Sequence, residues 1–331
     1  MDKIFKVVQM GLGPIGTGVT KYLIEKSNIE IVGAIDRDLS KCGKDLGSIA
    51  GLSTTGITIS DDLDRTLKNN KVDALILTTT SSLIGIYDQL SSILPFGVNV
   101  ISSCEELSYP WSNPQIADKI DILAKNNEVS VLGTGVNPGY LMDYLPMVLS
   151  GVCEDVKKIT VERIQDAKYR RLPFQLKIGA NTTVDEFNIR VKAGKLKHVG
   201  LSQSINMIAS FLGWKIDRID EVISPIVAVH KIKLENSIIE PGKVLGVQQI
   251  GLGIVNGEDK INMIFRATID DPEPRDRIII DGSPPIDMLI KNGVNGDIAT
   301  CAILVNSIPN LIQSTPGLKT MLDINPPHYH L

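Results

Sequence analysis

The sequence has few cysteines, and no two of them lie at the spacing of a metal-binding or redox motif. Four cysteines occur among 331 residues and are widely separated, at Cys42, Cys104, Cys153 and Cys301. Such spacing disfavours both a disulfide framework and a zinc knuckle. We therefore expect free thiols in a reducing compartment.

An excess of positive charge is also missing. The chain carries 34 lysines and arginines against 38 acidic residues, for a net charge of −4. Nucleic-acid-binding proteins neutralise phosphates with surplus basic side chains, so we do not expect a nucleic-acid partner. The four histidines are His198 and His230, which are isolated, and His328 and His330 in the C-terminal tail. We expect no metal site.

Long hydrophobic runs are absent as well. No apolar stretch reaches the roughly 18 residues that span a bilayer. The N-terminus lacks the charged region, apolar core and cleavage site of a signal peptide, and residues 4–10 read directly as a strand. We therefore expect a cytoplasmic protein with no membrane partner.

The residues that are present indicate two domains, because the chain is too long for one ordinary core. Through about residue 135, short β-rich runs alternate with amphipathic helical stretches, which is typical of a doubly wound parallel sheet. Strands are expected at 6–10, 30–35, 73–78, 99–102 and 130–133, and helices at 14–26, 83–94 and 115–126.

Beyond about residue 140, apolar and polar residues alternate as in antiparallel strands with one solvated face. Strands are expected at 158–165, 222–234, 244–255 and 260–269, and helices at 183–193, 201–212 and 296–311. This pattern predicts an α+β domain. The predicted boundaries are 1–137 for the parallel-sheet domain, 138–295 for the α+β domain, and 296–331 for a helix and tail that return to the first domain.

A glycine motif, Gly11-Leu12-Gly13-Pro14-Ile15-Gly16, follows the first expected strand and opens the first expected helix. In this setting Gly11 takes the tight turn, Gly13 lets the backbone approach a pyrophosphate, and Gly16 lets the helix pack against the strand. The helix N-terminus then favours the anion. The motif predicts a dinucleotide site that includes Pro14 and Ile15, in a Rossmann domain, and therefore an oxidoreductase.

The end of the second expected strand bears on the choice of cofactor. Asp36 lies 20 residues after Gly16, where a carboxylate binds the ribose hydroxyls of NAD. Arg37 beside it is suited to the 2′-phosphate of NADP. The pair leaves the cofactor open between NAD and NADP.

Small hydroxyl residues end the strand at 73–78. Thr78, Thr79 and Thr80 lie at the carboxyl edge of the predicted sheet, where ligands bind in such folds. They either line the cofactor or form a polar loop that caps a helix.

Two adjacent carboxylates, Glu105 and Glu106, follow the expected strand at 98–102. A carboxylate beside a desolvated nicotinamide is suited to general acid–base work. Glu105 is the first choice and Glu106 the second, and one of the two is expected to cap or begin a helix. Ser103 is assigned to the cofactor, and Cys104 is expected to be buried rather than nucleophilic.

The last strand of the first domain runs into the segment 133–143, at the predicted domain junction. Its glycines permit close backbone approach, and Asn137 offers both a donor and an acceptor. Asn137, Pro138, Gly139 and Tyr140 are therefore predicted to bind substrate, and Asn137 the cofactor too. The alternative is a hinge turn without ligand contacts.

A basic cluster, Lys168, Arg170 and Arg171, lies in the second domain. It either holds a substrate carboxylate or forms a solvated charged loop, and we favour the loop.

With these motifs the chain resembles the 2,4-diaminopentanoate dehydrogenases and the related native amine dehydrogenases, whose architecture is like that of dihydrodipicolinate reductases. The resemblance covers essentially the full length. It rests on the glycine motif and on the segments 101–108, 133–143 and 293–300, most specifically on Cys-Glu-Glu-Leu-Ser and Gly-Val-Asn-Pro-Gly-Tyr. Dihydrodipicolinate reductase itself is disfavoured, because its paired histidines followed by lysine and its Pro-Ser-Gly-Thr segment have no counterpart here.

The resemblance implies a homodimeric enzyme of ornithine fermentation. It would oxidatively deaminate 2,4-diaminopentanoate to 2-amino-4-oxopentanoate and ammonia with NAD or NADP, and Glu105 would be the base. Rival interpretations are a dehydrogenase for simple amines or amino acids, and a non-catalytic NAD(H) sensor.

Overall fold

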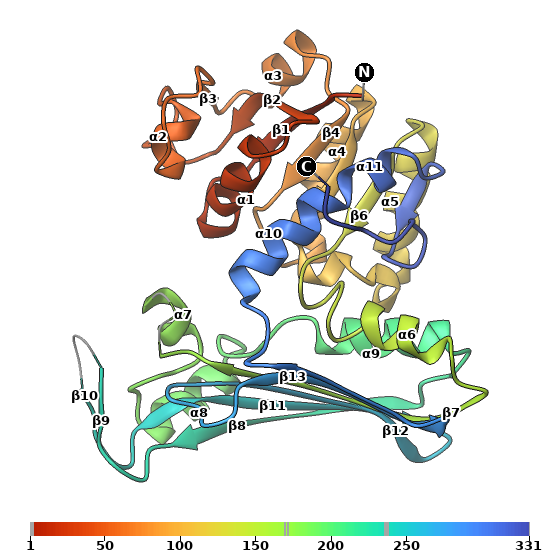
Figure 1. Cartoon of the computed structure of the whole chain (residues 1–331). Helices are drawn as coiled ribbons and strands as arrows, with labels where there is room; N and C mark the ends of the chain where they lie inside the picture. The colour runs from red at the N-terminus through yellow and green to blue at the C-terminus, as the bar shows by residue number, and fades with distance from the viewer. Residues whose placement is uncertain (1–2, 169, 171, 235–237, 331) are drawn as a thin grey trace. The chain divides into compact units, whose positions relative to one another are not determined.

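The computed structural model of the chain describes residues 3–168, 170, 172–234 and 238–330. It divides into two compact units. The first comprises residues 1–140 and 295–331, and the second residues 141–294 (Figure 1).

The first unit is built on a parallel sheet of seven strands in the order β15-β6-β5-β4-β1-β2-β3. Apart from β15, this is the order typical of dinucleotide-binding Rossmann folds. Its strands are β1 (Phe5–Met10), β2 (Ile29–Ile35), β3 (Ile59–Ser60), β4 (Ala74–Leu77), β5 (Asn99–Ser102), β6 (Ser130–Gly133) and β15 (Gly317–Lys319). Its α-helices are α1 (Pro14–Ile24), α2 (Leu46–Ala50), α3 (Leu63–Asn69), α4 (Leu83–Ile93), α5 (Pro114–Asn126), α10 (Gly296–Asn306) and α11 (Ile308–Ile312). Three short 3₁₀ helices are η1 (Leu94–Phe96), η2 (Glu105–Leu107) and η3 (Pro110–Ser112).

Burial explains why these residues form this sheet. All four residues of β4 are fully buried, as expected for a central strand that is covered on both faces. Helix α4 buries Leu83, Ile86, Leu90 and Ile93, whose spacing of three or four residues places them on one helix face. The apolar strands and helix faces together form the core of the unit.

The C-terminal segment completes this unit. Helix α10 packs on α1 so closely that a Cβ on Gly18 would lie 2.8 Å from the Cys301 sulfur. The helix expected from Gly296 to Leu311 is two helices, α10 and α11. Pro309 lies at the start of α11 and cannot donate the hydrogen bond that would continue α10.

The second unit contains a mixed sheet of six strands in the order β14-β13-β7-β12-β11-β8 and a two-stranded hairpin, β9-β10. Its strands are β7 (Asp155–Asp166), β8 (Arg218–Val227), β9 (Ile232–Lys233), β10 (Ile238–Ile239), β11 (Val244–Val255), β12 (Glu258–Thr268), β13 (Arg275–Ser283) and β14 (Ile286–Lys291). Its helices are α6 (Tyr144–Ser150), α7 (Leu172–Lys177), α8 (Val184–Lys192) and α9 (Leu201–Phe211). Helices α6 and α9 pack on one face of the six-stranded sheet.

This arrangement confirms the predicted α/β fold class, a Rossmann domain with a second α+β domain. Some strands of the second domain differ from those expected. The strand expected over 222–234 ends at Val227, because the hydrogen bonds of Ala228 with Gly242 and Lys243 close a loop that leads into the separate β9-β10 hairpin. Strands β13 and β14 were not anticipated, although residues 275–280 alternate between half-buried and buried positions.

Among the described residues, no helix is both long enough and apolar enough to cross a membrane.

Candidate functional site

The turn between β1 and α1 needs two of its three motif glycines for its own packing. Gly11 has φ +89°, and a Cβ on it would lie 2.6 Å from the carbonyl oxygen of Thr78. A Cβ on Gly16 would lie 1.8 Å from the carbonyl oxygen of Gly11. These glycines therefore bring α1 against the ends of β1 and β4.

Gly13 is different, because nothing in the chain itself requires a glycine there. Its φ is −72°, which any residue adopts, and a Cβ would have no neighbour within 4 Å. Gly13 is the N-cap of α1, and no side chain caps this helix, whose first residue is Pro14. The positive end of α1 thus faces open space beside a residue without a side chain, which is the arrangement that admits a phosphate.

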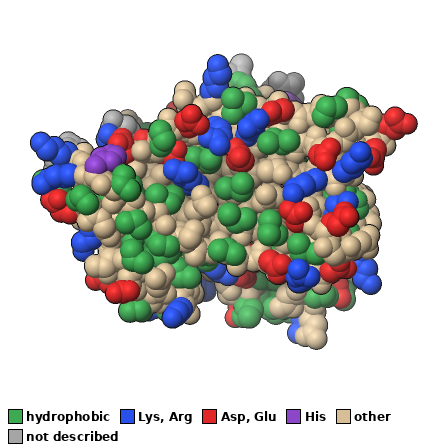
Figure 2. Space-filling model, turned by 90° about the horizontal axis from the view of Figure 1, so that it is seen from below, with side chains coloured by type: hydrophobic (Ala, Val, Ile, Leu, Met, Phe, Trp, Pro, Cys, Tyr) green, Lys and Arg blue, Asp and Glu red, His purple; other side chains and the backbone are tan. Residues whose placement is uncertain are grey.

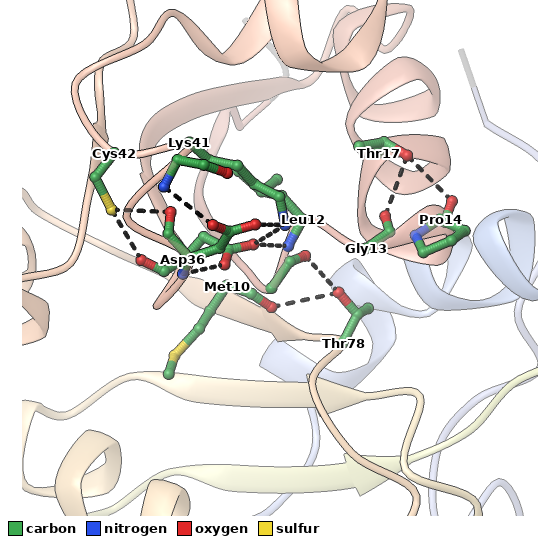
Figure 3. A network of polar contacts seen from close by, with 12 residues as sticks. Met10, Leu12, Gly13, Pro14, Thr17, Asp36, Lys41, Cys42 and Thr78 are labelled. Atoms are coloured by element: carbon green, nitrogen blue, oxygen red, sulfur yellow. Dashed lines mark hydrogen bonds and ion pairs between the residues drawn. The ribbon is translucent and has the colours of Figure 1, made fainter.

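Two polar side chains hold this turn in place. The Thr78 hydroxyl donates to the carbonyl oxygen of Gly11 at 2.7 Å. The fully buried Gln9 amide donates to the same carbonyl at 3.0 Å and to the Thr78 hydroxyl at 2.9 Å. The Thr78 hydroxyl therefore points to the glycine turn (Figure 3), although Thr78 also lines the adjacent cavity.

A cavity of about 350 Å³ lies at this edge of the sheet. Its size falls within the range of small-molecule sites. It is lined by Met10, Gly11, Leu12, Gly13, Ile35, Asp36, Arg37, Lys41, Thr78, Thr79 and Gln89. The glycine turn, the end of β2 and the loop after β4 therefore converge on one space, which is suited to a dinucleotide.

Asp36 is held firmly at the end of β2. Its Oδ2 accepts hydrogen bonds from the Leu12 amide at 2.7 Å and from Lys41 Nζ at 3.0 Å, and its Oδ1 accepts from the Asp38 amide at 2.8 Å (Figure 3). Burial by itself would raise the pKa of Asp36, but these hydrogen bonds and the Lys41 charge outweigh burial and lower it. The carboxylate is therefore charged and fixed where a ribose would be recognised.

Sequence reasoning missed Lys41, which lines the cavity and forms ion pairs with Asp36 at 3.0 Å and Asp38 at 3.6 Å. Burial acts to lower the pKa of Lys41, but these carboxylates raise it on balance. A lysine five residues after the acidic residue was the only available signal. Arg37 also lines the cavity, and its exposed guanidinium forms no hydrogen bond or ion pair with any residue that the structure describes.

The loop after β4 both lines the cavity and caps a helix. Thr79 lines the cavity, and its hydroxyl donates to the Gln89 side chain at 2.8 Å. Thr80 is not among the cavity-lining residues, and its hydroxyl accepts from the Ser82 amide at 3.2 Å. Ser82 caps α4 by accepting from the Gly85 amide.

The acidic pair, Glu105 and Glu106, lies on η2 directly after β5. The two carboxylates differ in their hydrogen bonds. The Leu83 amide at the start of α4 donates to Glu106 Oε2 at 2.7 Å, and the Glu106 amide donates to the carbonyl oxygen of Ser81 at 3.3 Å. Glu106 therefore caps a helix. Glu105 is half-buried, and its carboxylate forms no hydrogen bond or ion pair with any residue in the described ranges.

The neighbours of the acidic pair fix η2 in place. The buried Ser108 hydroxyl donates to the carbonyl oxygen of Glu105 at 2.7 Å. A Cβ on Gly133 would lie 2.4 Å from the Leu107 backbone, so the end of β6 touches η2. Burial raises the pKa of the Cys104 thiol to about 12, which excludes a thiolate nucleophile at neutral pH. Ser103 is half-buried, and its amide donates to the carbonyl oxygen of Leu77.

The segment after β6 is largely buried. Pro138 and Gly139 are buried, whereas Asn137 and Tyr140 are half-buried. Gly139 has φ +123°, and a Cβ there would lie 2.6 Å from the Gly135 nitrogen. Backbone packing therefore explains Gly139. Sequence alone suggested a ligand contact here, and that remains a prediction.

The parallel sheet aligns these pieces at one edge, because the carboxyl ends of parallel strands point the same way. Along that edge the β6 loop is followed by the acidic turn after β5, the Thr78–Thr80 loop after β4, the glycine turn after β1, and Asp36 after β2. Hydrogen bonds from η2 and α4 connect the acidic turn to the β4 loop. The acidic pair and the dinucleotide cavity therefore lie at the same edge of the sheet, with the β4 loop between them.

His198 and the described members of the basic cluster each contact a neighbouring side chain. No group of three or more metal-ligating side chains occurs among the residues that the structure describes. His198 stacks on Phe265, with ring centroids 4.2 Å apart. Burial and the charges of Lys177 and Arg163 lower its pKa to about 3. Within the basic cluster Lys168 pairs with Asp270 at 2.8 Å and Arg170 stacks on the Phe174 ring, while Arg171 lies outside the described residues.

Comparison with known proteins matches both halves of the chain to related families. Residues 140–330 match the model of the 2,4-diaminopentanoate dehydrogenase C-terminal domain, and residues 5–103 match that of the dihydrodipicolinate reductase N-terminus. The 2,4-diaminopentanoate dehydrogenase of Acetoanaerobium sticklandii is 38% identical, over 99% of this chain and 95% of that protein.

Two further proteins are similar over nearly their full length. The amine dehydrogenase of Streptomyces virginiae is 23% identical, over 97% of this chain and 96% of its own. Among solved structures, the amine dehydrogenase from Mycobacterium smegmatis superposes with a TM-score of 0.85 at 24% identity, covering 98% of this chain and 97% of that one.

Proposed function

The chain belongs to the 2,4-diaminopentanoate dehydrogenase family, and from this membership we propose that it oxidises 2,4-diaminopentanoate to 2-amino-4-oxopentanoate and ammonia. It is an NAD(P)-dependent dehydrogenase, as the resemblance implied. One observation carries the proposed chemistry. The carboxylate of Glu105, which has no partner among the described residues, lies on the turn that is hydrogen-bonded to the loop beside the dinucleotide cavity.

The cavity fits a dinucleotide on the chain's own geometry. The uncapped N-terminus of α1 and the open space beside Gly13 would hold the pyrophosphate. Asp36, at the end of β2, would bind the adenosine ribose. The nicotinamide, when bound, accepts the hydride that leaves C4 of the substrate.

The remaining chemistry belongs to Glu105. The substrate amine arrives as an ammonium ion and must lose a proton before its carbon can release hydride, because only a free nitrogen lone pair stabilises the resulting iminium. The Glu105 carboxylate would take that proton. After releasing that proton to solvent, the same carboxylate would remove a proton from the water that attacks the iminium, and the resulting carbinolamine would break down to the ketone and ammonia. Positioned acid–base groups of this kind contribute about 10²–10⁴-fold to the rate.

A matched pair of variants tests the assignment. In Glu105→Gln the group that takes the proton is lost and no hydrogen bond between described residues is broken. We expect kcat to fall about 10²–10⁴-fold while NADH binding is unchanged. Glu106→Gln keeps an amide oxygen that accepts from the Leu83 amide, so it should retain most activity. If Glu106→Gln is inactive and Glu105→Gln is active, the assigned base is wrong.

The substrate itself is tested by incubating the purified chain with 2,4-diaminopentanoate and NAD or NADP. We expect reduced cofactor and ammonia in equal amounts. The similarity to amine dehydrogenases favours a second candidate, oxidation of simple amines. A panel of amines without a carboxylate, compared by kcat/KM, distinguishes the two, since turnover of that panel alone would contradict our proposal.

We also propose a homodimer that forms through the face of the six-stranded sheet turned away from α9. Cβ atoms on Gly251 and Gly253 would contact Ile205 of α9, so the residues between and beside these glycines point to the opposite face. Figure 2 shows hydrophobic side chains among mixed charges on that face. Register places the following residues on it: Val222, Ile250, Leu252, Ile264, Ile279 and Leu289.

Two ion pairs on this face form within the chain. Arg275 binds Glu162 at 2.8 Å, and Arg277 binds Asp287 at 2.5 Å. A second copy can therefore cover these four side chains without separating their charges. We expect light scattering to give a dimer for the native chain and a monomer for Ile264→Lys, and a monomeric native chain would contradict the proposal. A cytoplasmic location stays a prediction.

A further inference from the structure

We infer that Lys41 sets the balance between NAD and NADP at this site. It uses one hydrogen-bond acceptor position of the Asp36 carboxylate, and it places a positive charge where the 2′-phosphate of NADP would bind. The inference rests on the proposed function, because it assumes that the cavity holds a dinucleotide. It concerns the three charged residues that line the cavity after β2, namely Asp36, Arg37 and Lys41.

The hydrogen bonds of Asp36 limit what it can still accept. A carboxylate has about four acceptor positions, two on each oxygen. Oδ2 accepts from the Leu12 amide and from Lys41, and Oδ1 accepts from the Asp38 amide. One position on Oδ1 remains, so Asp36 can accept from one ribose hydroxyl while Lys41 is in place.

The charge of Asp36 is also paired. A bare carboxylate repels a 2′-phosphate and so selects NAD. Here Lys41 Nζ lies 3.0 Å from Asp36 and 3.6 Å from Asp38, and its side chain is 24% exposed toward solvent and the cavity. An ammonium has three donors, so Lys41 can keep both carboxylates and still donate once more.

Arg37 supplies a second positive charge at the cavity. Its guanidinium is exposed and has no hydrogen-bonding or ionic partner among the described residues. A 2′-phosphate entering the cavity would therefore meet two cations and one neutralised carboxylate. NAD would meet a carboxylate with reduced accepting capacity. The site is thus less selective for NAD than Asp36 alone would make it.

Removing Lys41 should reverse this balance. Lys41→Met has a side chain of similar length without charge or donors. It frees an acceptor position on Asp36 for NADH and exposes NADPH to an unpaired carboxylate. We expect the Kd for NADPH to rise at least about tenfold, the loss of one charge-assisted contact to a phosphate. We expect the Kd for NADH to stay constant or to fall a few-fold. Lys41→Arg should keep NADPH binding within a few-fold of native.

The measurement is a titration of the full chain with NADH and NADPH, followed by nicotinamide fluorescence at two salt concentrations. Lys44→Met is the matched control, since Lys44 lies on the same loop but does not line the cavity. The native Kd for NADPH should rise more steeply with salt than that for NADH, and Lys41→Met should reduce this difference. If Lys41→Met unfolds, Lys41→Gln tests the charge alone, because its amide can still donate to Asp36.

Equal changes in both dissociation constants, or an unchanged Kd for NADPH in Lys41→Met, would overturn the inference. Failure of the native chain to bind either dinucleotide would overturn both the inference and the proposed function. The titrations need no amine. A chain that binds both dinucleotides but oxidises no amine would therefore contradict the proposed function alone.

Discussion

Replacing Gly13 by alanine should weaken dinucleotide binding without a large change in the free energy of unfolding. Gly13 has ordinary backbone angles, and a Cβ there would have no neighbour within 4 Å. Restricting the unfolded chain would gain about 0.4–1 kcal/mol, and the poorer N-cap would cost up to about as much. We therefore expect the free energy of unfolding to change by less than about 1 kcal/mol.

The same methyl group would occupy the space where a pyrophosphate must approach α1. We expect the Kd for NADH to rise at least about tenfold, or about 1.4 kcal/mol. Gly16→Ala is the contrasting variant. Its Cβ would lie 1.8 Å from the carbonyl oxygen of Gly11, so it should lower the free energy of unfolding by more than the roughly 1–3 kcal/mol typical of overpacking.

Thermal unfolding without nucleotide and fluorescence titration with NADH measure the two effects separately. Normal NADH binding by Gly13→Ala would refute the reasoning, because the phosphate would then lie elsewhere. So would a loss of stability in Gly13→Ala comparable to that in Gly16→Ala.

Two further predictions concern charged groups. The pKa of Asp36 is lowered in the folded chain, so its stabilising effect is present above the ordinary pKa of about 3.9 and is lost as pH falls through the folded value. Chemical denaturation should therefore show that Asp36→Asn lowers the free energy of unfolding by less at pH 3 than at pH 6. An equal loss at both pH values would contradict this prediction. Arg163 and Asp276 form a buried ion pair at 2.7 Å, with side chains 2% and 6% exposed. Arg163→Met alone should cost about 3–5 kcal/mol by urea denaturation, more than Arg163→Met combined with Asp276→Leu. An equal cost would show that the unpaired Asp276 carboxylate is not the cause.

Local patterns in the sequence were enough to predict the Rossmann domain. Continuous apolar runs such as residues 74–77 mark strands buried on both faces, and Gly11, Gly13 and Gly16 mark the turn after the first strand. The fold class and the family were both confirmed. The pattern failed where a local feature was overlooked, as at Pro309, which divides the C-terminal helix.

The residues of the site were also predicted only in part. The sequence placed Glu105 and Glu106 after a central strand and favoured Glu105 as the base, but it did not show which of the two caps a helix, because both follow the strand directly. The bond from the Leu83 amide to Glu106 joins residues 23 positions apart. No local pattern reports a contact of that range.

The sequence by itself determined which strands are buried, where the chain turns tightly at Gly11, and which family the protein resembles. These follow from properties of neighbouring residues. Tertiary structure alone decided that Glu106 caps α4 while Glu105 has no partner within the described part of the chain, that Lys41 pairs with Asp36, and that residues 317–319 add a strand beside β6. Each of these depends on which distant segments meet when the core closes, and burial patterns along the chain do not contain that information.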